Sequence, residues 1–316
     1  MTKCKKCEKG CNCQNIIPDS PKKFPDGANY RIEVSGIENV GILGAVVEEA
    51  KKCKIPIHRA IATVAGSSFY SNSDLTALAR FAAKEKIEVI ICPDNLAHGF
   101  FGNPNRNLNW QDKREIKSYI DEIHRCVKLG FRGFLTWSFS MLAMLTSLRD
   151  AEKIPSETIF KVSTFANCCN VLDFILAKRL KADTVNAANG LTLQNLADIR
   201  KAVPSVVIDV HIIFWQNYLA ENKEGRLELK TDFYDRIADA PEIARIASPV
   251  YFKFEAGTPG IGVYDVPRPD WSFKDLAEHK RKDVRVAAQI MKTIKEKYPQ
   301  LKLSDWGPED LRVPRV

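Results

Sequence analysis

The feature that most constrains the fold is a regular alternation of short strand-like segments with longer amphipathic ones, from about residue 31 nearly to the C-terminus. The short segments have the length and the β-branched content of strands, and the longer ones repeat apolar residues at helical spacing. The expected strands are Arg31–Ser35, Pro56–Ala60, Glu88–Cys92, Gly133–Trp137, Ile159–Thr164, Thr184–Asn186, Val206–Ile212 and Val250–Glu255. The expected helices cover about 39–53, 73–86, 112–129, 140–151, 168–181, 192–203, 235–247 and 279–298.

Eight such strand–helix repeats match the size and the period of a TIM (β/α)8 barrel, whose strands are parallel and whose sites lie at the C-terminal strand ends. An open doubly wound sheet is the alternative. It usually needs fewer strands, and no glycine-rich dinucleotide or NTP fingerprint follows any expected strand. The sequence therefore predicts an α/β fold, with a TIM barrel over 31–316 and a short Cys-rich extension and linker over 1–30.

Composition sets the broad class of the chain. Its 316 residues are 45% hydrophobic, as in ordinary globular proteins, and no apolar run approaches the length of a membrane helix. The N-terminus has no apolar signal segment, so a cytoplasmic location is expected. The net charge of +8 is spread along the chain without a nucleic-acid-binding motif, which favours a solvated basic surface.

Four cysteines lie together at the N-terminus, in a C-x2-C-x3-C-x-C array formed by Cys4, Cys7, Cys11 and Cys13. Four thiolates can hold a tetrahedral zinc ion or an iron–sulfur cluster, and the neighbouring lysines favour ionised sulfur. Ligands this close in sequence strain the geometry of a metal site. A reduced tail that binds no metal is therefore the alternative.

Several of the expected strands carry a charged face. In Tyr251–Glu255, Phe252 and Phe254 alternate with Lys253 and Glu255, and an outward apolar face turns the charged residues toward the barrel interior. The same assignment gives a middle layer formed by Glu33, Lys161, Asp209 and Lys253. It gives an upper layer that includes Ser35, Cys92 or Asp94, Ser163, Asn186, His211 and Glu255.

Charges inside a barrel are tolerated only when they are paired, and the middle layer contains two acids and two bases. One interpretation is an ion-pair network that only fixes the barrel. The other is the floor of a functional site, which we favour because barrels more often fill this space with Val, Ile and Leu.

The residue types predict roles. The candidate catalytic residues are His211, Glu255, Asp209, Lys253, Lys161 and Glu33, and the candidate substrate-binding residues are Ser35, Asp94, His98, Ser163 and Asn186. His211 is expected to move a proton, and Glu255 with Asp94 or Asp209 could complete a divalent-metal site. A Schiff-base amine at Lys253 or Lys161 is the alternative chemistry.

Three strand-to-helix connections are longer than the others: 95–111, 213–234 and 256–278. Loops of this length in a compact domain usually bind or cover ligands. All three follow the C-terminal ends of strands, so they are expected on the catalytic face.

The segments 161–167 (KVSTFAN) and 182–193 (ADTVNAANGLTL) resemble the collagenase-like peptidase family of uncertain catalytic type. The resemblance covers mainly 157–212 and extends loosely to 34–38. It implies a TIM barrel, and some members of the wider family are iron–sulfur proteins that act in hydroxylation. The family's cysteine arrangement is absent here, because Cys168 and Cys169 are adjacent and no C-terminal pair follows.

These observations predict an enzyme, a hydrolase or a lyase, that cleaves a small polar or anionic substrate by metal-assisted or acid/base chemistry. The alternative is a non-catalytic or redox component whose N-terminal cysteines bind zinc or an iron–sulfur cluster and dock a partner. The partner could be another protein or a second copy of the chain.

Overall fold

The computed structural model describes residues 17–64, 66–93, 113–215, 219–221, 227–229, 236–257 and 272–316. Only the backbone is described for 113–115, 213–215, 219–221, 227–229, 236–237 and 255–257. Among the described helices, none is long and apolar enough to cross a bilayer.

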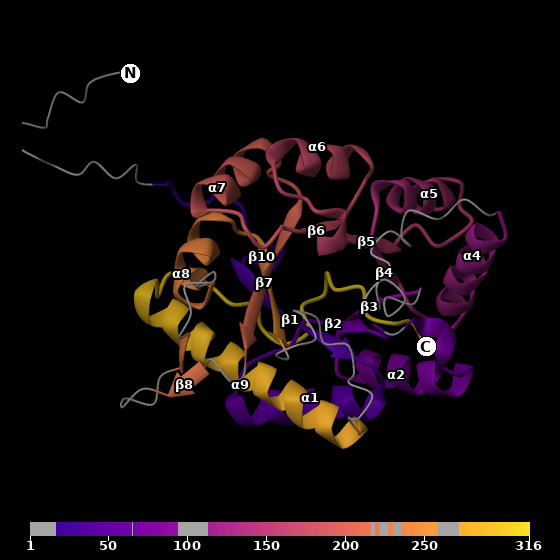
Figure 1. The fold of residues 1–316 in the computed structure, drawn as a ribbon, viewed down its shortest axis with the longest axis horizontal. Helices are drawn as coiled ribbons and strands as arrows, with labels where there is room; N and C mark the ends of the chain where they lie inside the picture. The colour runs from indigo at the N-terminus through magenta and orange to yellow at the C-terminus, as the bar shows by residue number, and fades with distance from the viewer. Residues whose placement is uncertain are drawn as a thin grey trace, which may run out of the picture.

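Eight parallel strands close into a barrel, in the spatial order β1-β2-β3-β4-β5-β6-β7-β10 and back to β1 (Figure 1). They are β1 Tyr30–Ile37, β2 Arg59–Ala62, β3 Glu88–Ile91, β4 Gly133–Thr136, β5 Ile159–Val162, β6 Thr184–Asn186, β7 Val207–Trp215 and β10 Val250–Gly257. Strands that follow one another in the barrel sequence are also neighbours in space. Each connection between them is therefore a strand–helix–strand crossover. The predicted TIM (β/α)8 barrel is confirmed.

Helices surround the barrel (Figure 1). They are α1 Val40–Cys53, α2 Asn72–Lys84, α4 Lys113–Lys128, α5 Phe139–Asp150, α6 Val171–Arg179, α7 Leu193–Ala202, α8 Arg236–Ile246 and α9 Phe273–Lys297. Four begin with a reciprocal capping box, in which the side chains of the N-cap and N3 residues satisfy otherwise orphaned backbone N–H groups.

Most observed bounds differ from the predicted ones by a few residues, and three differences matter for the barrel. The second strand is Arg59–Ala62, so it starts three residues later than the predicted Pro56 and ends two residues later than the predicted Ala60. The helix α9 begins at Phe273 rather than at 279, because Ser272 and Asp275 form its capping box. The connection after β7 contains an antiparallel hairpin of β8 Leu219–Glu221 and β9 Leu227–Leu229.

The main hydrophobic core lies between the strands and the helices. Phe252 and Phe254 of β10 are fully buried in this outer core, as their alternation with Lys253 predicts. The long helix α9 packs against α1 and against β10, where it completes the helical ring beside β1 (Figure 1). With its apolar residues turned outward, each strand leaves its other face for the barrel interior.

The segment after α9 crosses the N-terminal end of the barrel. Leu303 forms a bridge with Tyr30 of β1, and the backbone oxygens of Ser304 and Asp305 accept from His58 Nε2 at 3.2 and 3.1 Å. His58 Nδ1 accepts from the Ile32 N–H at 2.9 Å. Both ring nitrogens of His58 therefore attach this tail to the sheet.

Residues 17–29 close the same end from the other side. Phe24 is buried in an edge-to-face contact with Tyr251, at 5.4 Å between ring centroids, and the Arg31 guanidinium lies 4.1 Å from the Phe24 ring. Both terminal segments thus close the N-terminal end, here called the floor, and the C-terminal strand ends form the mouth.

Candidate functional site

A buried ion network fills the middle of the barrel, formed by Glu33 of β1, Arg59 of β2, Lys161 of β5 and Asp209 of β7. The Lys161 ammonium lies 3.0 Å from Glu33 Oε1 and 2.7 Å from Asp209 Oδ2. Arg59 Nη1 lies 3.3 Å from both Glu33 Oε2 and Asp209 Oδ1. Two acids and two bases therefore alternate around one ring, and Glu33, Lys161 and Asp209 are completely buried.

Arg59 extends this network toward the floor. Its Nε donates to Glu88 Oε1 at 2.5 Å, and its guanidinium lies 3.8 Å from the ring centre of Tyr251. Thr184 donates to Asp209 Oδ2 and accepts from Arg59 Nη1 at 3.5 Å. Arg59 thus joins three carboxylates, so its role is central to the charge balance of the interior.

Electrostatics in this network reflect a balance of opposing effects on Glu33. Burial raises the pKa of Glu33 above its ordinary value, the Lys161 and Arg59 cations act to lower it, and the Asp209 carboxylate raises it. Paired charges of this kind contribute little net stability, but removing one partner leaves an uncompensated buried charge.

A second polar set, here called the mouth group, consists of His211, Lys253, Asn186 and Trp137. Lys253 of β10 is the register partner of both Glu33 on β1 and His211 on β7. Asn186 of β6 pairs with Asp209, two residues before His211. Since side chains alternate along a strand, these three point into the barrel, one step nearer the mouth than the ion network.

His211 is 2% exposed and is held in its neutral form. Burial lowers the pKa of its imidazole well below the ordinary value, and the neighbouring Lys253 and Lys161 lower it further. A neutral imidazole offers one N–H donor and one acceptor, so it can pass a proton in either direction.

Two buried polar atoms of the mouth group make no hydrogen bond to any described residue: Asn186 Oδ1 and Trp137 Nε1. Asn186 and Trp137 are only 1% and 4% exposed and stand at the C-terminal ends of β6 and β4. An unsatisfied buried acceptor or donor costs about 1–3 kcal/mol, and such groups are characteristic of ligand sites.

Toward the mouth, beyond Arg59 and Glu88, the wall of the interior formed by β2, β3 and β4 is apolar. A separate buried cluster includes Ile61, Ile90, Cys92, Leu135 and Trp137, and Trp137 lies 6.4 Å from the Phe165 ring. The interior near the mouth is therefore two-sided, with charge and amide groups on β5 to β1 and an apolar surface opposite. A ligand with an anionic end and an apolar body would match both sides.

The remaining predicted residues fall into two groups. Ser35 and Ser163 are buried at the ends of β1 and β5, and Ser163 Oγ accepts from the Phe165 N–H at 3.3 Å. Asp94, His98, the side chain of Glu255 and the cysteines Cys4, Cys7, Cys11 and Cys13 lie outside the described residues. Their predicted roles therefore stay predictions.

The predicted divalent-metal site was tested on the donors that the structure describes. In the version of this site that includes Asp209, both carboxylate oxygens of Asp209 already bind Arg59, Lys161 and Thr184, so this donor set does not fit a metal ion. No cluster of His, Cys, Asp and Glu suited to a metal occurs among the described side chains. The other version, formed by Glu255 and Asp94, lies outside the described side chains and stays a prediction.

Two residues of the interior were not predicted as site residues from the sequence. Arg59 lies within the predicted strand Pro56–Ala60, but the inward face of that strand was not assigned, although the alternation of Arg59 and Ile61 with Ala60 and Ala62 is visible in the sequence. Trp137 was expected at the end of a strand, but an aromatic residue there is most often core. Its unsatisfied N–H is visible only in the fold.

Comparison with known proteins supplies no family. No protein-family model matches the chain, and no curated protein matches its sequence. Among solved structures, the YdjI aldolase from Escherichia coli is 14% identical, with 87% of this chain and 94% of that chain covered and a TM-score of 0.47. A truncated 3-deoxy-D-arabino-heptulosonate 7-phosphate synthase from Thermotoga maritima is 10% identical, with coverages of 87% and 90% and a TM-score of 0.48.

A U32 peptidase is also among the similar structures, at 14% identity, with coverages of 77% and 98% and a TM-score of 0.45. No family model supports the resemblance of segments 161–167 and 182–193 to the collagenase-like peptidases. Similarities of this size indicate neither a substrate nor a reaction. The fold and the interior define a TIM-barrel protein with a charged core, and the site itself must carry any functional argument.

Proposed function

We propose that this protein is an enzyme that cleaves a small anionic substrate by acid/base chemistry at the mouth of the barrel. The observation that carries the proposal is the convergence of four buried groups at the C-terminal strand ends. These are the His211 imidazole, the Lys253 ammonium, and the two polar atoms Asn186 Oδ1 and Trp137 Nε1 that no described residue satisfies.

Lys253 is suited to hold the anionic group of the substrate. It is 7% exposed, so an ion pair formed there is shielded from water and from salt. A buried cation at this position favours substrates with a negative charge over neutral analogues.

His211 is suited to move the proton, and substrate binding activates it. Lys253, whose charge lowers the pKa of His211, is partly neutralised when an anion binds to it, so the pKa of His211 rises in the complex. His211 then removes a proton from a substrate hydroxyl, a carbonyl forms at that carbon, and the adjacent bond breaks. The protonated imidazole returns the proton to the departing atom.

Asn186 and Trp137 are suited to orient the substrate. The Asn186 Oδ1 accepts from a substrate hydroxyl, and the Trp137 N–H donates to an oxygen on which negative charge develops. The buried ion network contributes indirectly, because Lys161 is fixed by Glu33 and Asp209 and cannot turn toward the substrate. Glu33, Lys161 and Asp209 are therefore assigned to positioning and electrostatics.

The proposal is tested by finding a substrate and then removing the proton carrier. A panel of small hydroxy acids, 2-oxo acids and their phosphorylated forms is screened for cleavage with the full-length protein. For the best substrate, His211→Asn is expected to lower kcat by about 10²–10⁴-fold, the usual contribution of a positioned acid/base group. Lys253→Met is expected to raise KM more than it lowers kcat, because it removes binding of the anion.

A matched control is His279→Asn, which replaces a buried histidine on α9 outside the barrel interior. It should leave kcat within about threefold of wild type, and circular dichroism should show each variant folded. Full activity in both His211→Asn and Lys253→Met would refute the proposed site, whereas loss in the His279 variant as well would assign the effect to folding.

A further inference from the structure

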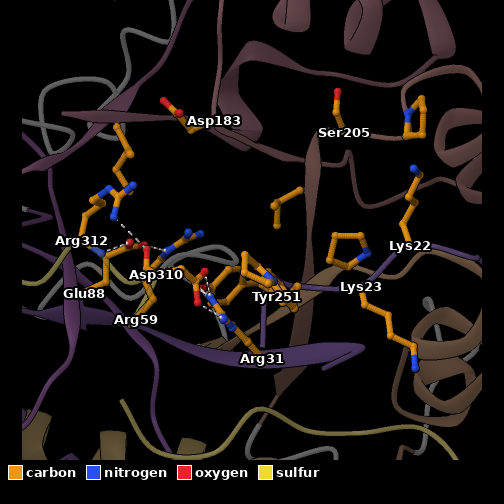
Figure 2. A pocket seen from close by; sticks show the side chains of 16 residues that line it. Lys22, Lys23, Arg31, Arg59, Glu88, Asp183, Ser205, Tyr251, Asp310 and Arg312 are labelled. Atoms are coloured by element: carbon orange, nitrogen blue, oxygen red, sulfur yellow. Dashed lines mark hydrogen bonds and ion pairs between the residues drawn. The ribbon is translucent and has the colours of Figure 1, made fainter. Parts of the chain in front are cut away.

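A cavity of about 400 Å³ lies at the floor, opposite the mouth group (Figure 2). It is lined by residues at the N-terminal ends of the strands, including Arg31, Arg59, Glu88 and Tyr251, and by residues of both terminal segments. Enzymatic sites of TIM barrels occupy the other end, so the cavity is no part of the proposed active site. Its volume is nonetheless in the range of small-molecule sites.

The deep wall of this floor cavity is charged and paired. Arg31 donates to both carboxylate oxygens of Asp310, at 2.9 and 2.6 Å, and Arg59 binds Glu88 (Figure 2). Glu88 Oε2 also accepts from the Arg312 backbone N–H at 2.9 Å. Both acids are thus neutralised by protein cations, whereas Arg59 Nη2 makes no hydrogen bond to any described residue.

The rim of the cavity has an excess of positive charge. Lys22, Lys23 and Arg312 are exposed and line it, and none of the three has an ion pair with a described residue. The remaining acid of the lining, Asp183, is paired with Arg149 at 2.9 Å. After the internal pairs are matched, three positive charges surround the opening.

The opposite surface of the cavity is apolar. Phe24 and Tyr251 contribute their rings, and Val207, Pro204 and Pro249 complete this side. Tyr251 and Phe24 are 1% and 5% exposed and lie beneath the guanidinium groups of Arg59 and Arg31, whereas Pro204 and Val207 are half-buried. A cavity that joins a cationic rim to an apolar wall is complementary to an organic anion rather than to an inorganic ion alone.

We propose that the floor cavity is a second binding site, for a small organic anion whose carboxylate or phosphate lies among Lys22, Lys23, Arg312 and Arg59. The body of the ligand packs on Pro204 and Val207, beside Phe24 and Tyr251. The site is independent of the proposed reaction at the mouth, and its binding is measurable without any substrate.

The test is calorimetric titration of the full chain with four probes: phenyl phosphate, benzoate, inorganic phosphate and acetate. Saturable binding is expected for phenyl phosphate or benzoate. The corresponding small anion, inorganic phosphate or acetate, should bind more weakly, and high salt should weaken the binding of every probe. Preference for phenyl phosphate assigns the site to phosphate esters, and preference for benzoate assigns it to carboxylates.

Two variants locate the binding. Lys22→Ala/Lys23→Ala removes two charges from the rim and should weaken binding about tenfold or more, since two charge-assisted contacts are lost. Lys84→Ala/Lys178→Ala removes the same charge from exposed positions on α2 and α6 and should leave the affinity within about twofold. Lys253→Met, at the mouth, should do the same.

The proposal is overturned if no probe binds saturably, or if the two double variants weaken binding equally. Weakening by Lys253→Met with no effect of Lys22→Ala/Lys23→Ala would place the bound anion at the mouth and would also refute the floor site. Failure of the proposed enzymatic reaction would leave these outcomes unaffected.

Discussion

The buried ion network and the mouth group lie one step apart in the same barrel, yet they treat charge in opposite ways. In the network, Glu33, Arg59, Lys161 and Asp209 alternate in sign at distances of 2.7 to 3.3 Å. In the mouth group, a neutral histidine faces two lysines, and two polar atoms have no described hydrogen-bond partner.

The two sets differ in how far their charges are paired. In the network each charge has an oppositely charged neighbour, although Glu33 Oε1 contacts Lys161 without a hydrogen bond, and this pairing holds the strands in place. Groups held in an unfavourable or incomplete environment destabilise the fold slightly, and a ligand can relieve that cost. The ion network fits the interpretation in which paired charges fix the barrel, and the mouth group, one step nearer the strand ends, is where we propose the functional site.

The largest expected effect comes from breaking the network. Arg59→Met leaves three carboxylates, those of Glu33, Glu88 and Asp209, around the single cation of Lys161. The free energy of unfolding should fall by about 3–5 kcal/mol, the cost of an unpaired buried charge. Urea denaturation measures it, and Lys181→Met, which breaks an exposed pair with Asp150, should cost under about 1 kcal/mol. Equal effects of the two changes would contradict a buried network.

A somewhat smaller effect is expected from the pH dependence of His58 at the floor. Burial lowers the pKa of His58 to about 4, and the nearby Arg31 also lowers it. In the unfolded chain this histidine binds a proton near pH 6.5, so the free energy of unfolding falls as the pH drops from about 6.5 to about 4, by about 3 kcal/mol in all.

His58→Gln removes this titration while keeping one donor and one acceptor. The stability difference between wild type and His58→Gln should therefore narrow as the pH is lowered from 7 to 4.5, as measured by urea denaturation at each pH. A difference that stays constant over this interval would show that His58 is not held neutral by the fold.

A pair of changes on β6 compares the two sets directly. Thr184→Val removes the hydroxyl that bonds Asp209 and should lower the free energy of unfolding by about 1–3 kcal/mol. Asn186→Leu, two residues further on, removes an unsatisfied amide of similar size and should leave stability unchanged or raise it by up to about 1 kcal/mol. Thermal or urea unfolding of both variants measures the two changes in stability. A larger loss of stability for Asn186→Leu than for Thr184→Val would contradict the assignment of Thr184 to the ion network and of Asn186 to the mouth group.

The smallest effect is expected on a single pKa. Lys253→Met removes a cation that disfavours the imidazolium, so the pKa of His211 should rise, while Arg285→Met on the outer surface of α9 should leave it unchanged. Nuclear magnetic resonance of the histidine ring protons follows both titrations. An unchanged pKa of His211 in the Lys253 variant would place the two side chains too far apart for the proposed mechanism.

The sequence by itself determined the fold and much of the interior. The period-two alternation of β10 predicts which of its side chains turn inward, and Lys253, Phe252 and Phe254 lie on the predicted faces. A shift by one residue would remove both phenylalanine rings from the core between strands and helices, which is unfavourable. The same rule predicted Glu33, Lys161, Asp209 and Lys253 as one layer, and the first three meet in the ion network, whereas Arg59 takes the place expected for Lys253. This prediction was possible because the period-two pattern of each strand depends only on which of its own faces is covered by helices.

Only the tertiary structure decided how these charges are used. Arg59 comes from a strand whose start the sequence misplaced, and it joins Glu33, Glu88 and Asp209 from three other strands. The tail that supplies Asp310 to Arg31 and two carbonyls to His58 lies more than 240 residues away along the chain. Contacts between segments that are distant in the sequence produce no periodic pattern in it. Buried polar groups that have a hydrogen-bond partner can therefore be distinguished from those that have none only in the folded barrel.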